Sequence, residues 1–352
     1  MIKVDNCRFN LRTIGVTMAI VAALEVAPNF TATAQSSTPW ESYKAAESCP
    51  TGTVVRAPRE YEDLRSISPQ EFRRREGIFL PQEMMRLIAE RQPTWLRSIK
   101  CSKSDIRRRG TSRKRRQVIA GGSLSRNWSG YVAAQRPYVD IMGRWKEPTV
   151  SAPSGQTAKS SVWMGVGTGN SMSDPLVQAG TLQTVIDGKA DYKVVYEVVP
   201  KEDSAQIIDN FPIKPGDEMY ISMGKTPKYA YFAIYNLTDN YSAVLYDSYP
   251  EIDDKIDTTA EWIVERPGQS DGSLSMLANY RKLHFYKAGA SYLEGVGHEP
   301  ASPVALGAEP MDMTSCADDK ILSEAGPLYV EGEPYAGIDI TWRNYGQVDY
   351  CQ

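Results

Sequence analysis

Two patterns of apolar and polar residues divide this chain near Arg116. Before that point the spacing is helical. Two capping boxes, Thr38-Pro39-Trp40-Glu41 and Ser68-Pro69-Gln70-Glu71, each place proline at the first helical position. The stretch from Pro81 to Gln92 adds a third amphipathic pattern. The sequence therefore predicts a mainly helical segment over residues 35–116.

After residue 116 the pattern changes to short runs rich in valine, tyrosine, tryptophan and isoleucine, separated by Pro, Gly and Asn turn signals. No convincing helical stretch interrupts them, so residues 117–352 are predicted to form one all-β domain, a sandwich of antiparallel sheets. The predicted strands are Ser160–Val166, Tyr192–Val199, Glu218–Met223, Tyr229–Tyr235, Thr258–Val264, Lys282–Tyr286 and Ile338–Trp342.

One of these strands carries two acids on the same face. The two-residue period of a strand places Glu261, Ile263 and Glu265 on one side, and Trp262 and Val264 on the other. A solvated strand face explains such a pair of acids equally well, so the pattern alone does not define a site.

The N-terminus has the features of a secretory signal peptide over residues 1–34. Three basic residues precede an apolar run from Ile14 to Ala27, and Ala32-Thr33-Ala34 supplies a small-residue cleavage pattern. A membrane anchor is the alternative, but the run is too short to span about 30 Å of hydrocarbon and Glu25 interrupts it. We therefore expect a secreted protein, extracellular or periplasmic, that acts as a monomer without binding a membrane.

Charge separates the two halves of the exported chain. Residues 35–116 hold 19 basic and 10 acidic side chains, a net of +9, whereas residues 117–352 carry a net of −13. The basic runs Arg107–Arg109 and Arg113–Arg116 lie in a Gly/Ser-bearing linker that is open to proteases. A nucleic-acid-binding tail has a similar composition, but an exported chain favours a processing site. The sequence thus predicts a propeptide (residues 35–116) that opposite charge holds over the acidic domain as an intramolecular inhibitor.

Removal of a signal peptide leaves four cysteines, an even number in an oxidising compartment. Three pairings are possible. We expect Cys49–Cys101 and Cys316–Cys351, because processing at the basic run then leaves each bond within one fragment.

Several chemistries find no support in the residues. The chain has no Gly-rich phosphate loop and no Gly-x-Ser-x-Gly elbow, and its only histidines are His284 and His298. No cluster of cysteine and histidine has metal-ligand spacing, so no metal and no cofactor is expected. Carboxylate and amide chemistry remains.

Seven motifs in one order resemble the landmarks of the glutamic peptidases, the eqolisin family. They cover roughly residues 127–285, and their order is far more specific than any one of them. The motifs are Asn127-Trp128-Ser129-Gly130-Tyr131, Trp145 with Glu147-Pro148, Ser161-Val162-Trp163-Met164-Gly165-Val166, Leu176-Val177-Gln178-Ala179-Gly180, Tyr196-Glu197 with Pro200, Pro215-Gly216-Asp217, and Ala260-Glu261-Trp262-Ile263-Val264-Glu265.

The resemblance implies a signal peptide, a propeptide and a mature domain of two curved antiparallel sheets, concanavalin-like, that hydrolyses polypeptides. The family's catalytic glutamine falls on Gln178 and its catalytic glutamate on Glu265, rather than on Glu261. Family aromatic residues near the site match Trp128, Trp163 and Tyr196, with Glu197 beside them.

Elementary chemistry is consistent with this pair. A glutamate with a pKa near about 4.3 is half ionised in acid, so it can take a proton from water and return it to a leaving amine. A glutamine amide does not titrate, and its N–H groups can bind an oxyanion at any pH.

Two departures from the family pattern affect the expected pH optimum and specificity. Gly167 and Leu182 stand where fungal members have aspartates, and residues 288–352 have no clear counterpart. Two other classes remain open: a glycoside hydrolase with Glu197 and Glu265 as its carboxylate pair, and a non-catalytic, lectin-like sandwich.

Overall fold

A computed structural model of the chain describes residues 40–58, 63–107, 123–167, 175–226, 228–248, 258–292, 300–330 and 335–350. Residues 38–352 cluster into one compact unit. The predicted signal peptide, the basic residues from Arg108 to Arg116 and Cys351 lie outside the described residues. The propeptide boundary near residue 116 therefore stays a prediction.

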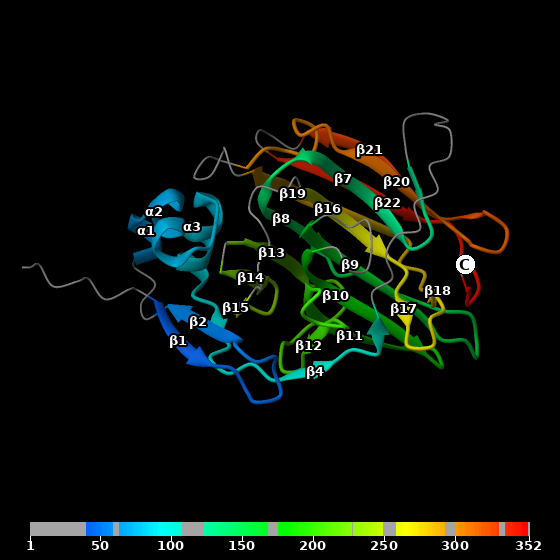
Figure 1. Cartoon of the computed structure of the whole chain (residues 1–352), viewed down its shortest axis with the longest axis horizontal. Coiled ribbons are helices and arrows are strands. Elements are labelled where there is room, and N and C mark those ends of the chain that lie inside the picture. The colour runs from blue at the N-terminus through cyan, green and yellow to red at the C-terminus, as the bar shows by residue number, and fades with distance from the viewer. Residues whose placement is uncertain are drawn as a thin grey trace, which may run out of the picture. The chain divides into compact units, whose positions relative to one another are not determined.

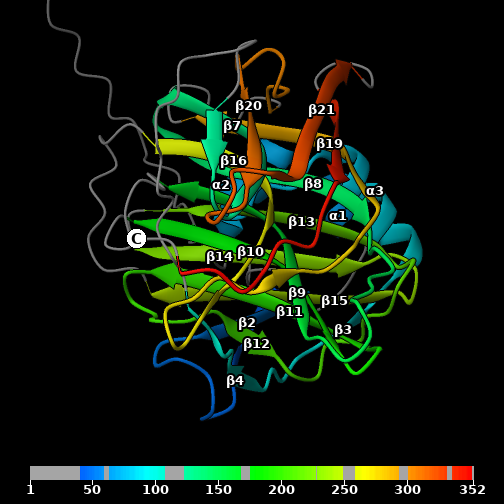
Figure 2. The ribbon, with the colours of Figure 1, turned by 90° about the vertical axis from the view of Figure 1, so that its right-hand side faces the viewer.

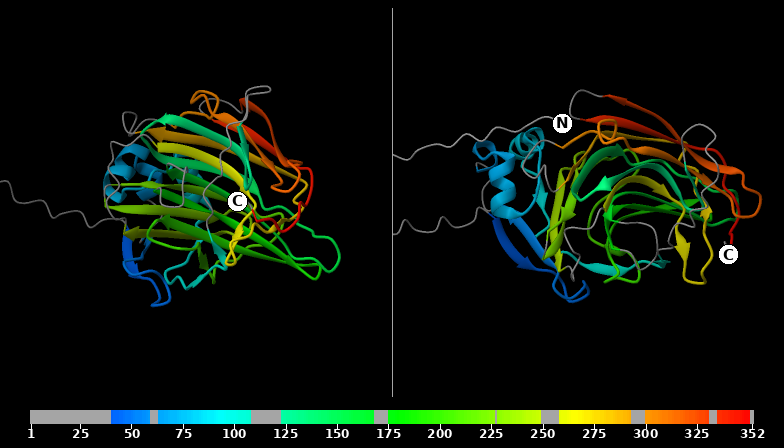
Figure 3. Two further views of the ribbon diagram at one scale, coloured as in Figure 1. Left: turned by 45° about the vertical axis from the view of Figure 1, so that its right-hand side comes forward. Right: turned by 45° about the horizontal axis from the view of Figure 1, so that its top comes forward.

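One layer of the structure, here called the site sheet, is a run of antiparallel neighbours in the order β12, β11, β10, β9, β16, β7 and β20. Its strands are β7 (Trp128–Arg136), β9 (Ala158–Gly167), β10 (Leu176–Ile186), β11 (Lys189–Val199), β12 (Gln206–Ile208), β16 (Thr258–Glu265) and β20 (Glu309–Thr314). The long strands of this sheet are curved (Figure 3).

The second layer, here called the back sheet, has the order β22, β19, β8, β13, β14, β15, β2 and β1. Its strands are β1 (Trp40–Lys44), β2 (Val54–Pro58), β8 (Tyr138–Lys146), β13 (Glu218–Lys225), β14 (Tyr229–Asn236), β15 (Tyr241–Ser248), β19 (Lys282–Tyr292) and β22 (Ala336–Trp342). Strand β21 (Ile321–Val330) pairs with β20 and with β22, and so joins the two layers at one edge (Figure 2).

Six short strands complete the pairing. Strand β6 is parallel to β20, β18 to β9 and β3 to β15, while β4 is antiparallel to β12 and β5 to β17. Their bounds are β3 (Thr94–Trp95), β4 (Cys101–Lys103), β5 (Ile106–Arg107), β6 (Ser123–Ser125), β17 (Gly268–Gln269) and β18 (Met276–Leu277).

Alternate residues of each strand face the core between the two sheets. On β16, Trp262 and Val264 join this core, and the indole N–H of Trp262 donates to the carbonyl of Met142 on β8 at 3.1 Å. Glu261, Ile263 and Glu265 face the other way, as the two-residue period predicted. The remaining predicted strands also form, so the all-β sandwich is confirmed.

The outer face of the back sheet is covered by three helices (Figure 1). These are α1 (Asp63–Ser66), α2 (Pro69–Glu76) and α3 (Gln82–Arg91). Ser68 caps α2 by accepting a hydrogen bond from the backbone N–H of Glu71 at 3.2 Å, which confirms that capping box. These helices pack on the sheet through an apolar cluster, to which the ion pair between Arg73 and the buried Asp140 is added.

The predicted helix at Thr38-Pro39-Trp40-Glu41 is wrong, because residues 40–44 form strand β1. Trp40 is buried against Phe72 and Trp95, with ring centroids 5.5 and 5.0 Å apart. Backbone pairing with β2 and this aromatic packing outweigh the local capping pattern. The segment before residue 107 thus contributes strands as well as helices.

Cys49 and Cys101 form a disulfide bond, as predicted. Cys316 is also disulfide-bonded. Its expected partner, Cys351, lies outside the described residues.

Candidate active site

The face of the site sheet that turns away from the core carries the predicted site residues other than Tyr196. In register across three strands lie Glu261 on β16, Gly165 on β9 and Gln178 on β10, and Glu197 follows on β11. Four residues further along β16, Glu265 is opposite Ser161. The alternation of each strand therefore gathers residues from four distant segments on one face.

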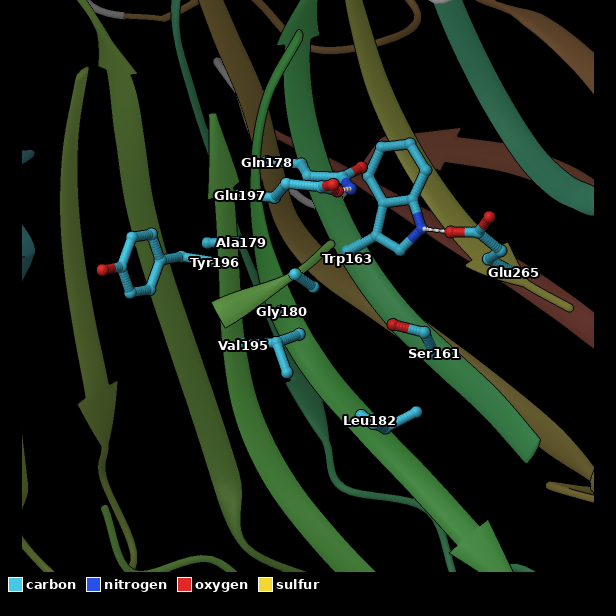
Figure 4. A pocket seen from close by; sticks show the side chains of 11 residues that line it. Ser161, Trp163, Gln178, Ala179, Gly180, Leu182, Val195, Tyr196, Glu197 and Glu265 are labelled. Carbon is cyan, nitrogen blue, oxygen red and sulfur yellow. Dashed lines mark hydrogen bonds between the residues drawn. The ribbon is translucent and has the colours of Figure 1, made fainter. Parts of the chain in front are cut away.

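A pocket on this face is lined by both Gln178 and Glu265 (Figure 4). It has about 440 Å³ of empty space, part of it open to solvent. The lining residues are Ser161, Trp163, Gln178, Ala179, Gly180, Leu182, Val195, Tyr196, Glu197, Ala205 and Glu265. One pocket thus contains both the amide of Gln178 and the carboxylate of Glu265.

Neutral N–H donors hold both carboxylate oxygens of Glu265. The indole N–H of Trp163 donates to Oε2 at 2.8 Å, and Nδ2 of Asn127 donates to Oε1 at 3.2 Å. All three side chains are buried or nearly so. Because a carboxylate with both oxygens bonded has little rotational freedom, these donors fix the orientation of Glu265.

The Gln178 amide is held by Glu197 on the neighbouring strand. Nε2 of Gln178 donates to Oε2 of Glu197. A glutamine amide has two N–H groups, so one remains for another acceptor. The Glu197 carboxylate thereby determines which end of the amide is the nitrogen.

Trp163 stands between the two halves of the site. Its indole projects from β9 with Gln178 and Glu197 on one side and Glu265 on the other (Figure 4). A Cβ atom on Gly180 would lie 2.6 Å from both Cα and Cβ of Trp163, so only glycine fits beside it. Trp128 packs edge-on against Trp163, with centroids 5.0 Å apart. Trp163 therefore lines the pocket, whereas Trp128 packs against Trp163 without lining the pocket itself.

Tyr196 is not placed to act in the pocket through its side chain. It lies on the core face of β11, where its ring packs against Phe232 at 5.1 Å. Its hydroxyl is 3.8 Å from Sγ of Cys101, on the far side from Gln178 (Figure 4). Burial raises the pKa of this phenol well above its ordinary value.

Glu261, the other acid of β16, has a different environment from Glu265. Glu261 accepts a hydrogen bond from Thr259 Oγ1 at 2.6 Å and does not line the pocket, although its register position is closer to Gln178. Strand residues rise about 3.3 Å each, so Glu261 and Glu265 are about 13 Å apart along the strand. The pocket therefore contains one of the two acids.

Gly167 and Leu182, the two departures from the family pattern, change the backbone and the lining of the site. A Cβ atom on Gly167 would lie 2.4 Å from the carbonyl oxygen of Pro175, so this backbone does not accommodate an aspartate there. Leu182 lines the pocket and packs with Val195. This part of the pocket is apolar where fungal members place an acid.

Two features of the site were missed by reasoning from sequence. Asn127 was noticed as part of a motif, but its bond to Glu265 depends on the pairing of β7 with β16. Lys159 precedes the Trp163 motif on β9, and its ion pair with Asp105 joins residues 54 positions apart. Local periodicity cannot reveal either contact.

Within the described part of the chain, no group of three or more His, Cys, Asp or Glu residues is arranged to hold a metal ion. No helix among those residues is long and apolar enough to cross a membrane.

Fold and site together define an antiparallel β-sandwich protein with an amide–carboxylate pocket on its curved sheet. A family model described as the Peptidase A4 family matches residues 126–321. The chain belongs to the Peptidase A4 family.

Individual relatives share low sequence identity with this chain. Aspergillopepsin-2 from Aspergillus niger is 28% identical over 186 residues, which cover 47% of this chain and 64% of that protein. The chain thus matches less than two thirds of this curated relative's length. The crystal structure of scytalido-glutamic peptidase with a transition state analog inhibitor gives a TM-score of 0.49 at 17% identity, covering 62% of this chain and 98% of that one. Aspergilloglutamic peptidase from Aspergillus niger gives 0.43 at 25% identity, covering 53% and 99%.

Proposed function

We propose that this protein is an endopeptidase that acts in acid, with Glu265 as general base and acid and Gln178 as oxyanion stabiliser. The observation that carries the proposal is the single pocket lined by both residues, in which Trp163 and Asn127 orient the carboxylate of Glu265. Family membership supports the same reaction class.

The reaction begins with a water molecule beside Glu265. The ionised carboxylate takes a proton from the water as its oxygen attacks the peptide carbonyl. Negative charge develops on the carbonyl oxygen, and the free N–H of Gln178 donates to it. Glu265 then gives its proton to the leaving amine, which breaks the C–N bond and restores the carboxylate.

Glu197 is a positioning residue in this scheme. By accepting one N–H of Gln178, it keeps the amide nitrogen in place, and the second N–H remains for the oxyanion. A glycoside hydrolase with Glu197 and Glu265 as its pair gains no support from this bond, because Glu197 is engaged with the amide.

The segment before the basic run is proposed to inhibit the enzyme for as long as it remains bound to the pocket face. Ser104 donates its backbone N–H to the carbonyl of Ala205 in the pocket wall at 2.9 Å. Strand β5 then pairs with β17, which begins three residues after Glu265. A chain in this position lies beside the pocket, where we expect it to hinder the approach of a substrate.

We also propose that the protein is exported before it acts. The predicted signal peptide over residues 1–34 supports this, as does the Cys49–Cys101 bond, since disulfides persist in oxidising compartments.

Casein hydrolysis by the processed protein between pH 2 and 7, with pepstatin and a chelator present, tests the proposal. Activity should appear in acid and be insensitive to both inhibitors. Glu265→Gln and Gln178→Ala should each lower kcat by about 10²–10³ or more, whereas Glu261→Gln should retain activity. Full activity in Glu265→Gln would overturn the assignment, and a lectin-like protein would show no hydrolysis at all.

A further inference from the structure

Lys159 lies on the same face of the site sheet as the pocket. It precedes Ser161 by two residues on β9, and Ser161 is in register with Glu265. Two residues of a strand span about 7 Å. The ammonium group of Lys159 therefore lies close to the proposed scissile position. The separation is about the length of two residues of an extended peptide.

The partner of Lys159 comes from the proposed inhibitory segment. Nζ of Lys159 lies 2.6 Å from Oδ2 of Asp105, and the exposed fractions of the two side chains are 6% and 71%. Among the described residues, no other ion-pair partner of Lys159 is present within 4.0 Å. A buried ammonium is costly unless an anion pairs with it. Removal of the segment thus leaves a cation on the pocket face without its counter-ion.

The neighbouring lysine on this face differs. Lys193 is in register with Leu182 and lies 3.6 Å from Asp191 on its own strand. Its side chain is also more exposed than that of Lys159. The charge of Lys193 is therefore balanced within the sheet, whereas that of Lys159 is balanced from outside it.

Asp105 reaches Lys159 from a bend between two stretches, residues 101–103 and 106–107, that pair as strands with β12 and β17. On one side of Asp105, Ser104 bonds to Ala205, and on the other side Ile106 pairs with Gln269. Backbone pairing on both sides with one side chain in a specific contact is the usual mode of extended-peptide recognition. Asp105 is positioned as a substrate side chain would be.

We propose that Lys159 is a specificity-determining residue that selects substrates with an aspartate or glutamate near the scissile bond, and that Asp105 imitates this side chain in the precursor. The inference rests on the proposed peptidase function and names its substrate class. Charge-assisted hydrogen bonds are about twice as strong as neutral ones, which makes one acidic residue a strong determinant.

A peptide series tests the proposal. The parent is an uncharged peptide that the processed enzyme cleaves, and one aspartate or one asparagine is placed in turn at each of the four positions on either side of the cleaved bond. Values of kcat/KM are measured at pH 5, where a free aspartate with a pKa of about 3.9 is ionised. The enzymes are wild type, Lys159→Gln, Lys159→Glu and the matched control Lys193→Gln.

Wild type and Lys193→Gln should prefer aspartate over asparagine about tenfold or more at one position, in line with a hydrogen bond to a charged group. Lys159→Gln should lose this preference, so that its kcat/KM values for the aspartate and asparagine peptides become equal. Lys159→Glu should prefer lysine at that position instead.

A second measurement does not depend on the folding of any variant. Synthetic peptides of residues 100–107, with Asp105 or with asparagine in its place, are compared as inhibitors of wild type. The asparagine peptide should be about tenfold or more weaker. Equal inhibition by the two peptides, or a preference for aspartate that survives in Lys159→Gln, would overturn the assignment of Lys159 alone. Failure to cleave any peptide would overturn the peptidase function, and the inference with it.

Discussion

Arg266, the residue after Glu265, is paired with Asp349 near the C-terminal end of the chain. Nη1 and Nη2 of Arg266 both lie 3.0 Å from Oδ2 of Asp349, and the arginine side chain is fully buried. Its guanidinium also donates to the carbonyls of Ser275 and Gln347. The C-terminal segment, which lies beyond the family match, therefore fixes the strand end that bears Glu265.

Loss of this ion pair should be strongly destabilising. Asp349→Ala leaves a buried guanidinium without its anion, which typically costs about 3–5 kcal/mol. Urea unfolding monitored by tryptophan fluorescence measures the change. Asp318→Ala is the matched control, because Asp318 pairs with Lys320 at the surface and such pairs contribute about 0–1 kcal/mol. Equal effects in the two variants would contradict the prediction.

The disulfide of Cys316 should connect to Cys351. The backbone N–H of Cys316 lies 3.3 Å from Oδ2 of Asp349, so the two segments already meet. Peptide mapping of the non-reduced protein by mass spectrometry should recover the Cys316–Cys351 pair. A loop of this size is worth about 3–4 kcal/mol in the chain-entropy model, so Cys351→Ser should lower the free energy of unfolding accordingly. A free thiol at Cys316 in the native protein would refute the pairing.

Trp163 should matter for turnover through its N–H as well as its ring. Trp163→Phe retains an aromatic ring but removes the donor to Glu265, and we expect kcat to fall about tenfold or more with little change in KM. Trp128→Phe is the control, because the indole N–H of Trp128 has no hydrogen-bond acceptor among the described residues. If both variants lose kcat equally, packing rather than orientation of Glu265 explains the role of Trp163.

The folded protein should be more stable in acid than at neutral pH. Burial raises the pKa of Glu147 to about 7 and that of Glu202 to about 8, against ordinary values near 4.5. For Glu147, hydrogen bonds from Gln183, Thr181 and Trp145 oppose the rise and the charge of Asp217 adds to it. A carboxyl whose pKa is raised by folding stabilises the protein below its unfolded pKa. That stability is lost as pH rises through the folded value.

Unfolding in urea at pH 4, 6 and 8 measures this dependence. Glu147 by itself should account for about 3 kcal/mol, since one pKa unit corresponds to about 1.4 kcal/mol. Glu147→Gln removes the titrating group, so it should flatten the loss between pH 5 and 8. Greater stability of the wild type at pH 8 than at pH 4 would be inconsistent with buried neutral carboxyls.

The segment before the basic run should stay attached after the chain is cut. Phe72, Phe79 and Met85 are fully buried against the back sheet, and each such side chain contributes about 1.5–3 kcal/mol. Arg73 on α2 forms an ion pair with the fully buried Asp140 on β8. Opposite net charge was the expected source of this association, and the structure adds the apolar burial of these three side chains.

An engineered protease site between residues 108 and 122 tests the attachment. After cleavage, gel filtration should recover both parts in one peak at low and at high salt, because apolar burial is not screened. Separation of the parts in high salt alone would show that charge holds them. Arg73→Gln serves as a comparison, since it removes the ion pair and leaves the apolar contacts.

The sequence by itself determined the local elements and the order of the motifs. Alternation on Thr258–Glu265 was sufficient to place Trp262 in the core and Glu265 on the opposite face, because the side-chain period of a strand is fixed by backbone geometry. The Ser68 capping box was also predicted correctly, because both of its partners lie within one helical turn.

Only the tertiary structure decided which distant residues meet. The local sequence of residues 38–41 predicts the start of a helix. Residues 40–44 nevertheless form a strand, because Trp40 is buried against Phe72 and Trp95. The bonds from Asn127 to Glu265 and from Lys159 to Asp105 depend on strand register. Register is set by pairing between segments far apart in the chain, and no local pattern encodes that pairing.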